Sequence, residues 1–433
     1  MDTGKRYYSL LAAAALGLGV APAAEPQPAG AAKVQTEHEA LETLRRTRDA
    51  LIEVGDFAAA LQPAEQVVGA LDGRSGFDVA EDLLRLGLVQ AGLEDYDAAE
   101  ISYLNAIERL QRAQGVFSAA LIPAYHGLGR AYIDARRYAD AVTALEHART
   151  LGHRNFGLFD PAQVPVLDDL TRAHLESGND AAARALEEQR LKKAIRHFGA
   201  DAPELVPFYR HLGDFYYRHL ARLYGNLPSS FRAHDQYWKA LEIASARSGD
   251  ASPESLDLLR RLTAVEMHFD DRPRGRERLL AALESHAEID PRERGLSLAA
   301  LGDFAAVEGD SAAAERYYAA AYEALREADG VAADELFAAP QMLDFVPPDD
   351  GVDGSAPFPA WRWGTIELAF DVSAAGRASD VRTVAAQPGV DALASAYRKR
   401  IAAARFRPKL EHGRPVAATD VRYTARFRYY LPD

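Results

Sequence analysis

The chain contains no cysteine among its 433 residues. Disulfide bonds, thiolate metal sites and a lipid anchor on an N-terminal cysteine are therefore excluded, so the fold must be stabilised by packing alone. Motifs of catalysis are also absent, because there is no His-Glu-x-x-His, no Gly-x-Ser-x-Gly and no glycine-rich phosphate loop after a strand. We therefore expect no catalytic residues, no enzymatic activity and no cofactor.

The side chains that could bind a metal are scattered along the chain. The closest pair of histidines on a predicted helix, His211 and His219, is eight residues apart, which is too far for a site on adjacent turns. Asp168-Asp169 and Asp270-Asp271 are neighbours on predicted helices, so the two carboxylates of each pair point to different faces. We interpret these residues as surface charges and predict no metal site.

A long apolar run is missing after the N-terminus. Lys5 and Arg6 precede a short apolar run from Leu10 to Val20, and Ala21-Pro22-Ala23 offers the small residues that a signal peptidase needs. A membrane-spanning helix needs about 20 strongly apolar residues, and this run is shorter and is interrupted by glycine. We expect residues 1–23 to be a cleaved signal peptide and the mature chain to be periplasmic. The alternative is a retained inner-membrane anchor with the chain facing the periplasm.

The formal net charge of −14 is unevenly distributed. From Phe345 onward, thirteen Lys and Arg residues against ten Asp and Glu residues give +3, which leaves −17 on the preceding part. Nucleic-acid binding requires a basic surface, so the acidic part argues against a nucleic-acid partner. An apolar fraction of 48% is sufficient for the packed cores of two or three domains.

The acidic part of the chain is repetitive. Leu128-Gly129 is followed by Tyr138-Ala139-Asp140-Ala141, and the same order recurs at Leu86-Gly87 with Tyr96-Asp97-Ala98-Ala99. The positions aligned with Tyr138 follow one another at steps of 39, 42, 42, 50, 42 and 39 residues. These positions are Phe57, Tyr96, Tyr138, Asp180, Ser230, Arg272 and Ser311. Because one helix pair cannot bury its apolar face alone, such pairs stack into a superhelix with a concave groove.

The repeated pattern resembles the tetratricopeptide repeat, whose first helix carries Leu-Gly and whose second helix begins with an aromatic residue and an alanine. The resemblance implies an all-α solenoid of about seven repeats over residues 34–330. The step near 42 residues is similar to the longer-helix variety of this repeat. Asp180, Ser230 and Arg272 replace the aromatic residue in three units, so the assignment of those units depends on spacing.

The segment from Val331 to Pro359 is rich in proline, glycine and aspartate. This composition indicates a linker over residues 331–359. About 25 residues of such composition would let the tail move against the repeats over tens of ångströms.

The tail has the pattern of a small α+β domain. From Ile366 to Val372 apolar residues alternate with polar residues or alanine, which is the period of a half-buried strand, and Gly376 lies in the turn that follows. Between Val390 and Ala404 apolar residues recur at helical spacing, and Pro408 stops this helix. We predict the order strand, strand, helix, strand, with the last strand from Thr419 to Tyr430.

Two short signatures connect this tail to a known family. Arg405-Phe406-Arg407-Pro408 and Gly413-Arg414-Pro415-Val416 follow the helix in that order, and Pro357-Phe358-Pro359-Ala360 precedes the first strand. The region 360–433 thereby resembles the C-terminal domain of TonB. In that family the domain captures an extended segment of an outer-membrane transporter along the edge of its last strand, which is β-augmentation.

The resemblance implies a partner-binding edge on the last strand. The residues concerned are Arg422, Tyr423, Arg426, Phe427, Arg428 and Tyr429. The arginines would attract acidic residues of a captured segment. The alternative is a solvated basic face that keeps an edge strand from aggregating.

A second candidate site lies in the predicted groove of the repeats. His126, Arg130, Arg172 and Arg210 fall at positions of the first helices that line the concave side in repeats of this kind. We hypothesise a basic track for a peptide carboxylate or an acidic segment. The alternative is salt bridging between repeats, for example Asp168 with Arg172 at i,i+4.

The prediction as a whole is a multidomain protein with an all-α solenoid, a linker and a small TonB-like ββαβ domain. We expect a non-catalytic periplasmic adaptor that binds protein or peptide partners, with an outer-membrane transporter or envelope protein as candidates. One alternative is a divergent TonB-type energy transducer. Another is an accessory protein or chaperone of envelope assembly. The sequence does not define the oligomeric state.

Overall fold

The computed structural model describes residues 29–71, 77–219, 228–268, 274–352 and 360–430. The predicted signal peptide, residues 1–23, lies outside the described residues. Within the ranges that are described, none of the helices combines the length and the apolarity required to cross a bilayer.

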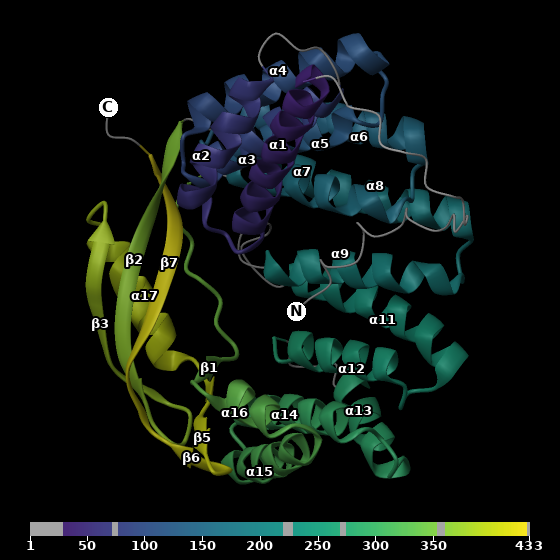
Figure 1. The fold of residues 1–433 in the computed structure, drawn as a ribbon. Helices are drawn as coiled ribbons and strands as arrows, with labels where there is room; N and C mark the ends of the chain where they lie inside the picture. Colours follow the sequence, from purple (N-terminus) through teal and green to yellow (C-terminus); the bar gives the residue numbers. More distant parts are fainter. Residues whose placement is uncertain (1–28, 72–76, 220–227, 269–273, 353–359, 431–433) are drawn as a thin grey trace.

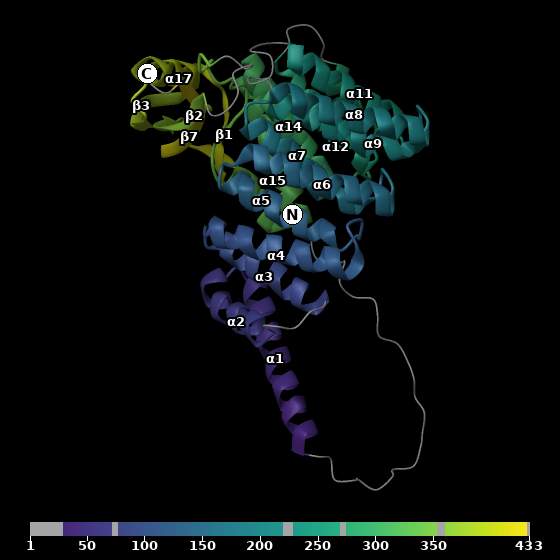
Figure 2. The same cartoon turned by 90° about the horizontal axis from the view of Figure 1, so that it is seen from above.

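Helices that stack one after another form the first three quarters of the molecule (Figure 1). Figure 2 shows α1 to α4 extending away from the C-terminal sheet. The first half of the array consists of α1 (Ala29–Glu53), α2 (Phe57–Ala70), α3 (Phe77–Gly92), α4 (Tyr96–Gln114), α5 (Leu121–Asp134), α6 (Tyr138–Phe156), η1 (Pro161–Gln163), α7 (Val164–Glu176) and α8 (Asp180–Phe198). The second half consists of η2 (Pro203–Leu205), α9 (Val206–Arg218), α11 (Pro228–Ser248), α12 (Pro253–Glu266), α13 (Arg274–Ser285), α14 (Pro291–Glu308), α15 (Ser311–Ala328) and α16 (Gly330–Phe337).

The repeat positions found in the sequence mark the starts of helices. Phe57, Tyr96, Tyr138, Asp180 and Ser311 are the first residues of α2, α4, α6, α8 and α15. Ser230 lies in the first turn of α11, and Arg272 falls outside the described residues. The residue before four of these helices is Asp or Asn, and its side chain accepts a hydrogen bond from a backbone N–H of the first turn.

The Leu-Gly positions are the points at which the paired helices approach most closely. A Cβ atom on Gly129 of α5 would lie 2.6 Å from the side chain of Leu145 on α6, so only glycine allows this approach. The same relation joins Gly213 to Tyr237 and Gly302 to Tyr318. In each pair the larger side chain is buried in the interface, which explains why the glycine recurs with the period of the repeat.

The C-terminal region forms a three-stranded antiparallel sheet in the order β3-β2-β7, with helix α17 against one face. The predicted order of strand, strand, helix and strand is confirmed. The elements are β1 (Gln341–Met342), β2 (Trp361–Val372), β3 (Ala378–Gln387), α17 (Asp391–Ala403), β4 (Phe406–Arg407), β5 (Lys409–Glu411), β6 (Arg414–Val416) and β7 (Ala418–Tyr430). The sequence did not predict β1, β4 or the hairpin of β5 and β6.

The core of the sheet follows the predicted alternation. Ile366, Leu368 and Phe370 of β2 are buried together with Tyr397 and Ile401 of α17. On β7 the predicted basic face is exposed at Arg422 and Arg426. Arg428 differs from this prediction because it is buried against Asp350, whose carboxylate lies 3.0 Å from its Nε.

The segment predicted as a linker is packed along the part that the structure describes, residues 331–352. Its first residues belong to α16, and β1 pairs with β4. The ring of Phe345 lies 5.5 Å from that of Tyr423, and Leu343 and Val352 are buried. The expectation of free movement is therefore not met here, because apolar side chains between the prolines anchor the segment on the sheet.

The C-terminal region runs beside the array in Figure 1 and forms ion pairs with it at two distant points. On β4, Arg407 forms a two-pronged ion pair with Asp303 of α14, and its Nε lies 2.8 Å from Oδ1. On β7, Arg426 reaches Glu176 of α7 at 3.0 Å. The C-terminal region thus joins α7 to α14, two helices that are more than 100 residues apart in sequence.

Candidate functional site

Three of the four residues predicted to line the groove gather around one carboxylate. Asp169 of α7 accepts from His126 Nε2 at 2.8 Å, and Arg130 Nε lies 3.9 Å away. Arg172 Nη1 is 3.8 Å from the other oxygen of Asp169 and also pairs with Asp134. These bases are therefore compensated by acids within and between repeats.

The fourth residue lies apart from this cluster. Arg210 of α9 pairs with Asp257 of α12 at 3.7 Å. A continuous track of uncompensated positive charge is not found, since each of the four bases has a carboxylate within 4.0 Å. The observed pairs involve Asp169, where the sequence suggested Asp168 as the partner of Arg172.

The environment of Asp169 stabilises its charged form. Burial acts to raise the pKa of Asp169, but the hydrogen bond and charge of His126 and the charges of Arg130 and Arg172 hold the pKa below its ordinary value. The group therefore joins α5 to α7 as an ion-pair network at neutral pH.

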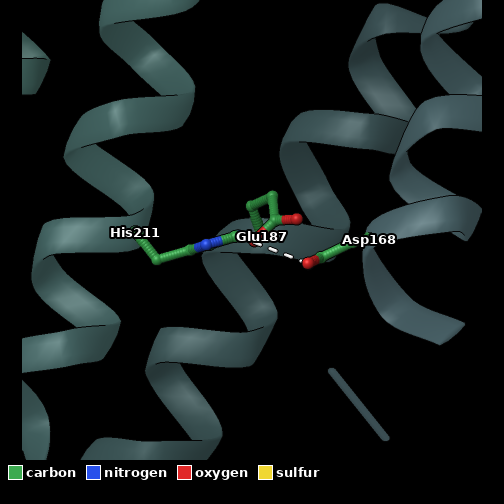
Figure 3. A group of neighbouring side chains, drawn as sticks. All are labelled: Asp168, Glu187 and His211. Atoms are coloured by element: carbon green, nitrogen blue, oxygen red, sulfur yellow. Dashed lines mark ion pairs between the residues drawn. The ribbon is translucent and has the colours of Figure 1, made fainter. Parts of the chain in front are cut away.

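A second polar cluster joins three helices of the array (Figure 3). Asp168 comes from α7, Glu187 from α8 and His211 from α9, and their ligand atoms lie within 4.8 Å of one another. Glu187 Oε2 is 2.9 Å from His211 Nε2, while the other oxygen of Glu187 accepts from Thr171 at 2.7 Å. The sequence analysis predicted no contact among these three residues.

An arginine already supplies the positive charge in this cluster. Arg190 Nη1 lies 3.2 Å from Asp168 Oδ1, 3.1 Å from His211 Nε2 and 3.8 Å from Glu187. A divalent ion bound by the same oxygens would have to displace this guanidinium. The arrangement therefore favours an ion-pair network, which fastens α7, α8 and α9 together, over a metal site.

The repeat register contains a signal for Glu187 that the sequence reasoning missed. Tyr103, Leu145 and Tyr318 stand seven residues after the first residue of α4, α6 and α15, and all three are buried. Glu187 takes this position in α8. Thr171 of α7 lies 42 residues after Gly129 of α5 and takes the equivalent position in its own repeat. The hydrogen bond between Thr171 and Glu187 replaces the apolar contact of the other pairs.

The predicted edge residues of the last strand divide into two groups. Phe427 is buried in the sheet core, and Tyr423 and Tyr429 pack against that core. Arg422 pairs with Asp420 at 2.7 Å. Arg426 lies over the ring of Trp363 at 4.3 Å and contacts Glu176 of the array.

The outer edge of β7 is not paired with another strand among the described residues. The strand lies at the end of the sheet order, and its other side pairs with β2. The N–H of Arg428 donates to Asp350 Oδ2 at 2.9 Å, so this N–H points away from β2. In an antiparallel ladder the direction alternates, so Arg422, Thr424 and Arg426 also direct their N–H and C=O groups outward.

The family comparison bears on the repeats. Residues 79–152 match the tetratricopeptide repeat model. This stretch spans α3 to α6 and includes two of the Leu-Gly positions. The molecule thus contains tetratricopeptide repeats in a helical array, which a small C-terminal sheet region follows.

Several solved structures match parts of the chain at low identity. A putative kinesin light chain with TPR-like repeats from Podosopora anserina is 16% identical, with 50% of this chain and 97% of that chain covered and a TM-score of 0.38. The structure of pilF of Pseudomonas aeruginosa is 16% identical, with 58% of this chain and 95% of that chain covered and a TM-score of 0.34. The Rap conjugation gene regulator of plasmid pLS20, in complex with the Phr* peptide, is 12% identical, with 70% of this chain and 79% of that chain covered and a TM-score of 0.35. No curated protein matches the chain.

Proposed function

We propose that this protein is a non-catalytic interaction scaffold of the cell envelope that captures an extended segment of a partner along the outer edge of β7. The observation that carries this proposal is the position of β7 at the end of the sheet, with its outward N–H and C=O groups between Arg422 and Arg426. A captured strand would satisfy these groups by β-augmentation. The similarity of the tail to the C-terminal domain of TonB supports the same mode.

Side chains at this edge favour an acidic segment. Arg422 and Arg426 are both exposed, and each already holds a carboxylate of this chain in a surface ion pair. Such pairs contribute little to stability, so a carboxylate of the partner can replace the internal one at small cost. Main-chain hydrogen bonds would supply the affinity, and the arginines would select the sequence.

The helical array is suited to hold further protein partners. Stacked repeats present an extended surface, and tetratricopeptide repeat structures include a Rap regulator with a bound Phr* peptide and the TPR2AB domain of yeast Sti1 in a pHSP90 complex. We propose protein or peptide partners for this chain as well. An outer-membrane transporter or an envelope protein is the class that the tail suggests.

Replacing Thr424 by proline tests the edge. Proline removes an outward N–H and obstructs a neighbouring strand, while the ladder with β2 does not use this group. The test titrates the protein with labelled peptides from periplasmic segments of outer-membrane transporters. Thr424→Pro should bind these peptides at least about ten times more weakly than the wild type does. Val384→Pro, on an exposed position of the opposite edge strand β3, is the matched control and should bind normally. Equal binding by wild type and Thr424→Pro contradicts the proposal.

The proposed location is periplasmic and depends on cleavage of residues 1–23. Fractionation of expressing cells with intact-mass analysis tests it directly. A soluble periplasmic chain that begins near Ala24 supports the scaffold. An inner-membrane chain that retains Met1 favours the alternative, a divergent energy transducer that acts on an outer-membrane transporter.

A further inference from the structure

A pocket of about 330 Å³ lies in the array where the ends of α6 and α8 meet the starts of α7 and α9. It is separate from the edge of β7 and from the cluster around Asp169, since it shares no residue with either. The volume is in the range of sites for small organic ligands.

The walls of the pocket are mainly apolar and aromatic. Phe159, in the turn before η1, lies 5.3 Å from the ring of Phe198 and 6.3 Å from that of Phe208. All three rings line the pocket and are only partly buried in the described structure. Their faces and edges offer a place for another flat apolar group.

Positive charge is available beside these rings. Lys193 of α8 lines the pocket and has no carboxylate within ion-pair distance among the described residues. Arg149 of α6 pairs with Glu146 through one nitrogen, while its buried Nε has no hydrogen-bond acceptor within the described structure. Burial together with the charges of Lys193 and Arg149 lowers the pKa of His153, which shows that both cations lie near this ring.

The acidic residues of the pocket do not cancel this charge. Asp160 accepts from the backbone N–H of Ala162 at the start of η1, and Glu204 is exposed at the rim. Arg190 also lines the pocket, but it is already paired with Asp168. Lys193 therefore remains for an anionic ligand, and the guanidinium of Arg149 also lines the pocket.

We propose that this pocket binds an aromatic carboxylate, with its ring against Phe159, Phe198 and Phe208 and its carboxylate toward Lys193 and Arg149. A free aromatic acid and the C-terminal phenylalanine of a peptide both present this chemistry. The inference adds a ligand site to the array and does not depend on capture at β7.

Isothermal titration of the full chain with 3-phenylpropionate, and separately with a short peptide ending in phenylalanine, tests the proposal. At least one of the two probes should show saturable binding with one-to-one stoichiometry. The probe that binds more tightly shows whether the ligand is a free aromatic acid or the C-terminus of a peptide. Because the carboxylate contributes a charge-assisted contact, 3-phenylpropanamide should bind at least about ten times more weakly than the acid.

Variants locate the site. Lys193→Gln should weaken binding about tenfold, and Phe159→Ala should weaken it as well, while Lys192→Gln, an exposed neighbour outside the pocket, should leave it unchanged. Circular dichroism identifies any variant that has lost its fold. If Phe159→Ala is such a variant, Lys193→Gln decides alone, because it removes the charge and keeps a polar side chain on the helix. Absence of saturable binding to both probes overturns the proposal, as does equal binding by Lys193→Gln and the wild type.

Discussion

Asp303 accepts from two side chains that belong to different parts of the chain. The guanidinium of Arg407 binds both of its oxygens, and the hydroxyl of Tyr318 donates to Oδ1 at 3.0 Å. The side chains of Asp303 and Arg407 are only 10% and 12% exposed. Loss of one charge would leave the other buried without its counter-ion.

We therefore expect Asp303→Asn to lower the free energy of unfolding by about 3 kcal/mol, as is typical when one partner of a buried pair is removed. Urea unfolding monitored by circular dichroism measures the change. The matched control is Glu108→Gln, which breaks the exposed pair with Arg112 and should cost less than about 0.5 kcal/mol. Similar losses in the two variants would contradict the structural role of the buried pair.

Glu187 makes the stability of the array depend on pH. Burial acts to raise its pKa, but the hydrogen bond and charge of His211, the hydrogen bond from Thr171 and the charge of Arg190 hold the pKa below its ordinary value. A carboxyl group whose pKa is lower in the folded state stabilises the protein above its unfolded pKa of about 4.3, and this contribution is lost as the pH falls through the folded value.

The stability difference between wild type and Glu187→Gln should therefore decrease as the pH falls below about 4. Asp168, His211 and Arg190 face this carboxylate, and the variant retains all three. Urea midpoints of both proteins at pH 6 and pH 3.5 give the comparison. A difference that does not change with pH would show that the charge of Glu187 does not stabilise the cluster.

Residue-level prediction from the sequence succeeded where a residue type has one structural use. The Leu-Gly positions marked close helix contacts because a side chain at Gly129 or Gly302 would overlap with the partner helix. It missed Glu187, although the repeat register places this carboxylate at a position that is apolar and buried in other units. Only the three-dimensional neighbours Thr171, His211 and Arg190 explain its burial.

At the scale of elements, the end of α7 meets the start of β2. Gly178 has a φ of +75° at this helix end, and a Cβ atom there would lie 2.7 Å from the ring of Trp361, which is fully buried. Gly309 ends α14 in the left-handed conformation, with a φ of +88° and a ψ of 5°, but nothing lies within 4 Å of its Cβ position. The two glycines have the same backbone requirement and differ in the neighbouring tryptophan.

Gly309→Ala should therefore lower the free energy of unfolding only by the cost of a left-handed alanine, about 1 kcal/mol. Gly178→Ala should lower the free energy of unfolding by this amount and by about 1–3 kcal/mol more, because Trp361 must move. Thermal unfolding gives both values, and tryptophan fluorescence should shift to the red in Gly178→Ala alone. Equal losses without a spectral change would place Trp361 away from α7.

The periodic elements could be predicted from the sequence, and the connecting ones could not. Alternation from Ile366 to Val372 defined β2, and helical spacing defined α17. The pairing of β1 with β4 joins Gln341 to Arg407, and residues so distant in sequence leave no local pattern. For the same reason Arg428 was assigned to an exposed face, although Asp350 covers it.

The whole molecule combines an acidic array with a sheet region of opposite net charge. The two contact each other through Arg426 with Glu176 and through Arg407 with Asp303, both of which pair a base of the sheet region with an acid of the array. Composition suggested a linker with free movement, because proline, glycine and aspartate occur together in this segment. Apolar residues among them, such as Leu343, Phe345 and Val352, are packed instead.

A fixed sheet has a functional consequence. Under the proposed function, the edge of β7 would be presented at a constant position relative to the repeats, so a partner segment and a second partner on the array would be held in a defined geometry. A mobile tail would lose this advantage and would act only as a tether.

The central claim is that the array and the sheet form one body, and the distance between two spin labels tests it most directly. The chain has no cysteine, so Ala139→Cys on α6 and Ala402→Cys on α17, both exposed, introduce a single labelled pair. Pulsed electron double resonance should give one narrow distance distribution. A broad distribution extending over tens of ångströms would contradict the docked sheet and restore the flexible linker.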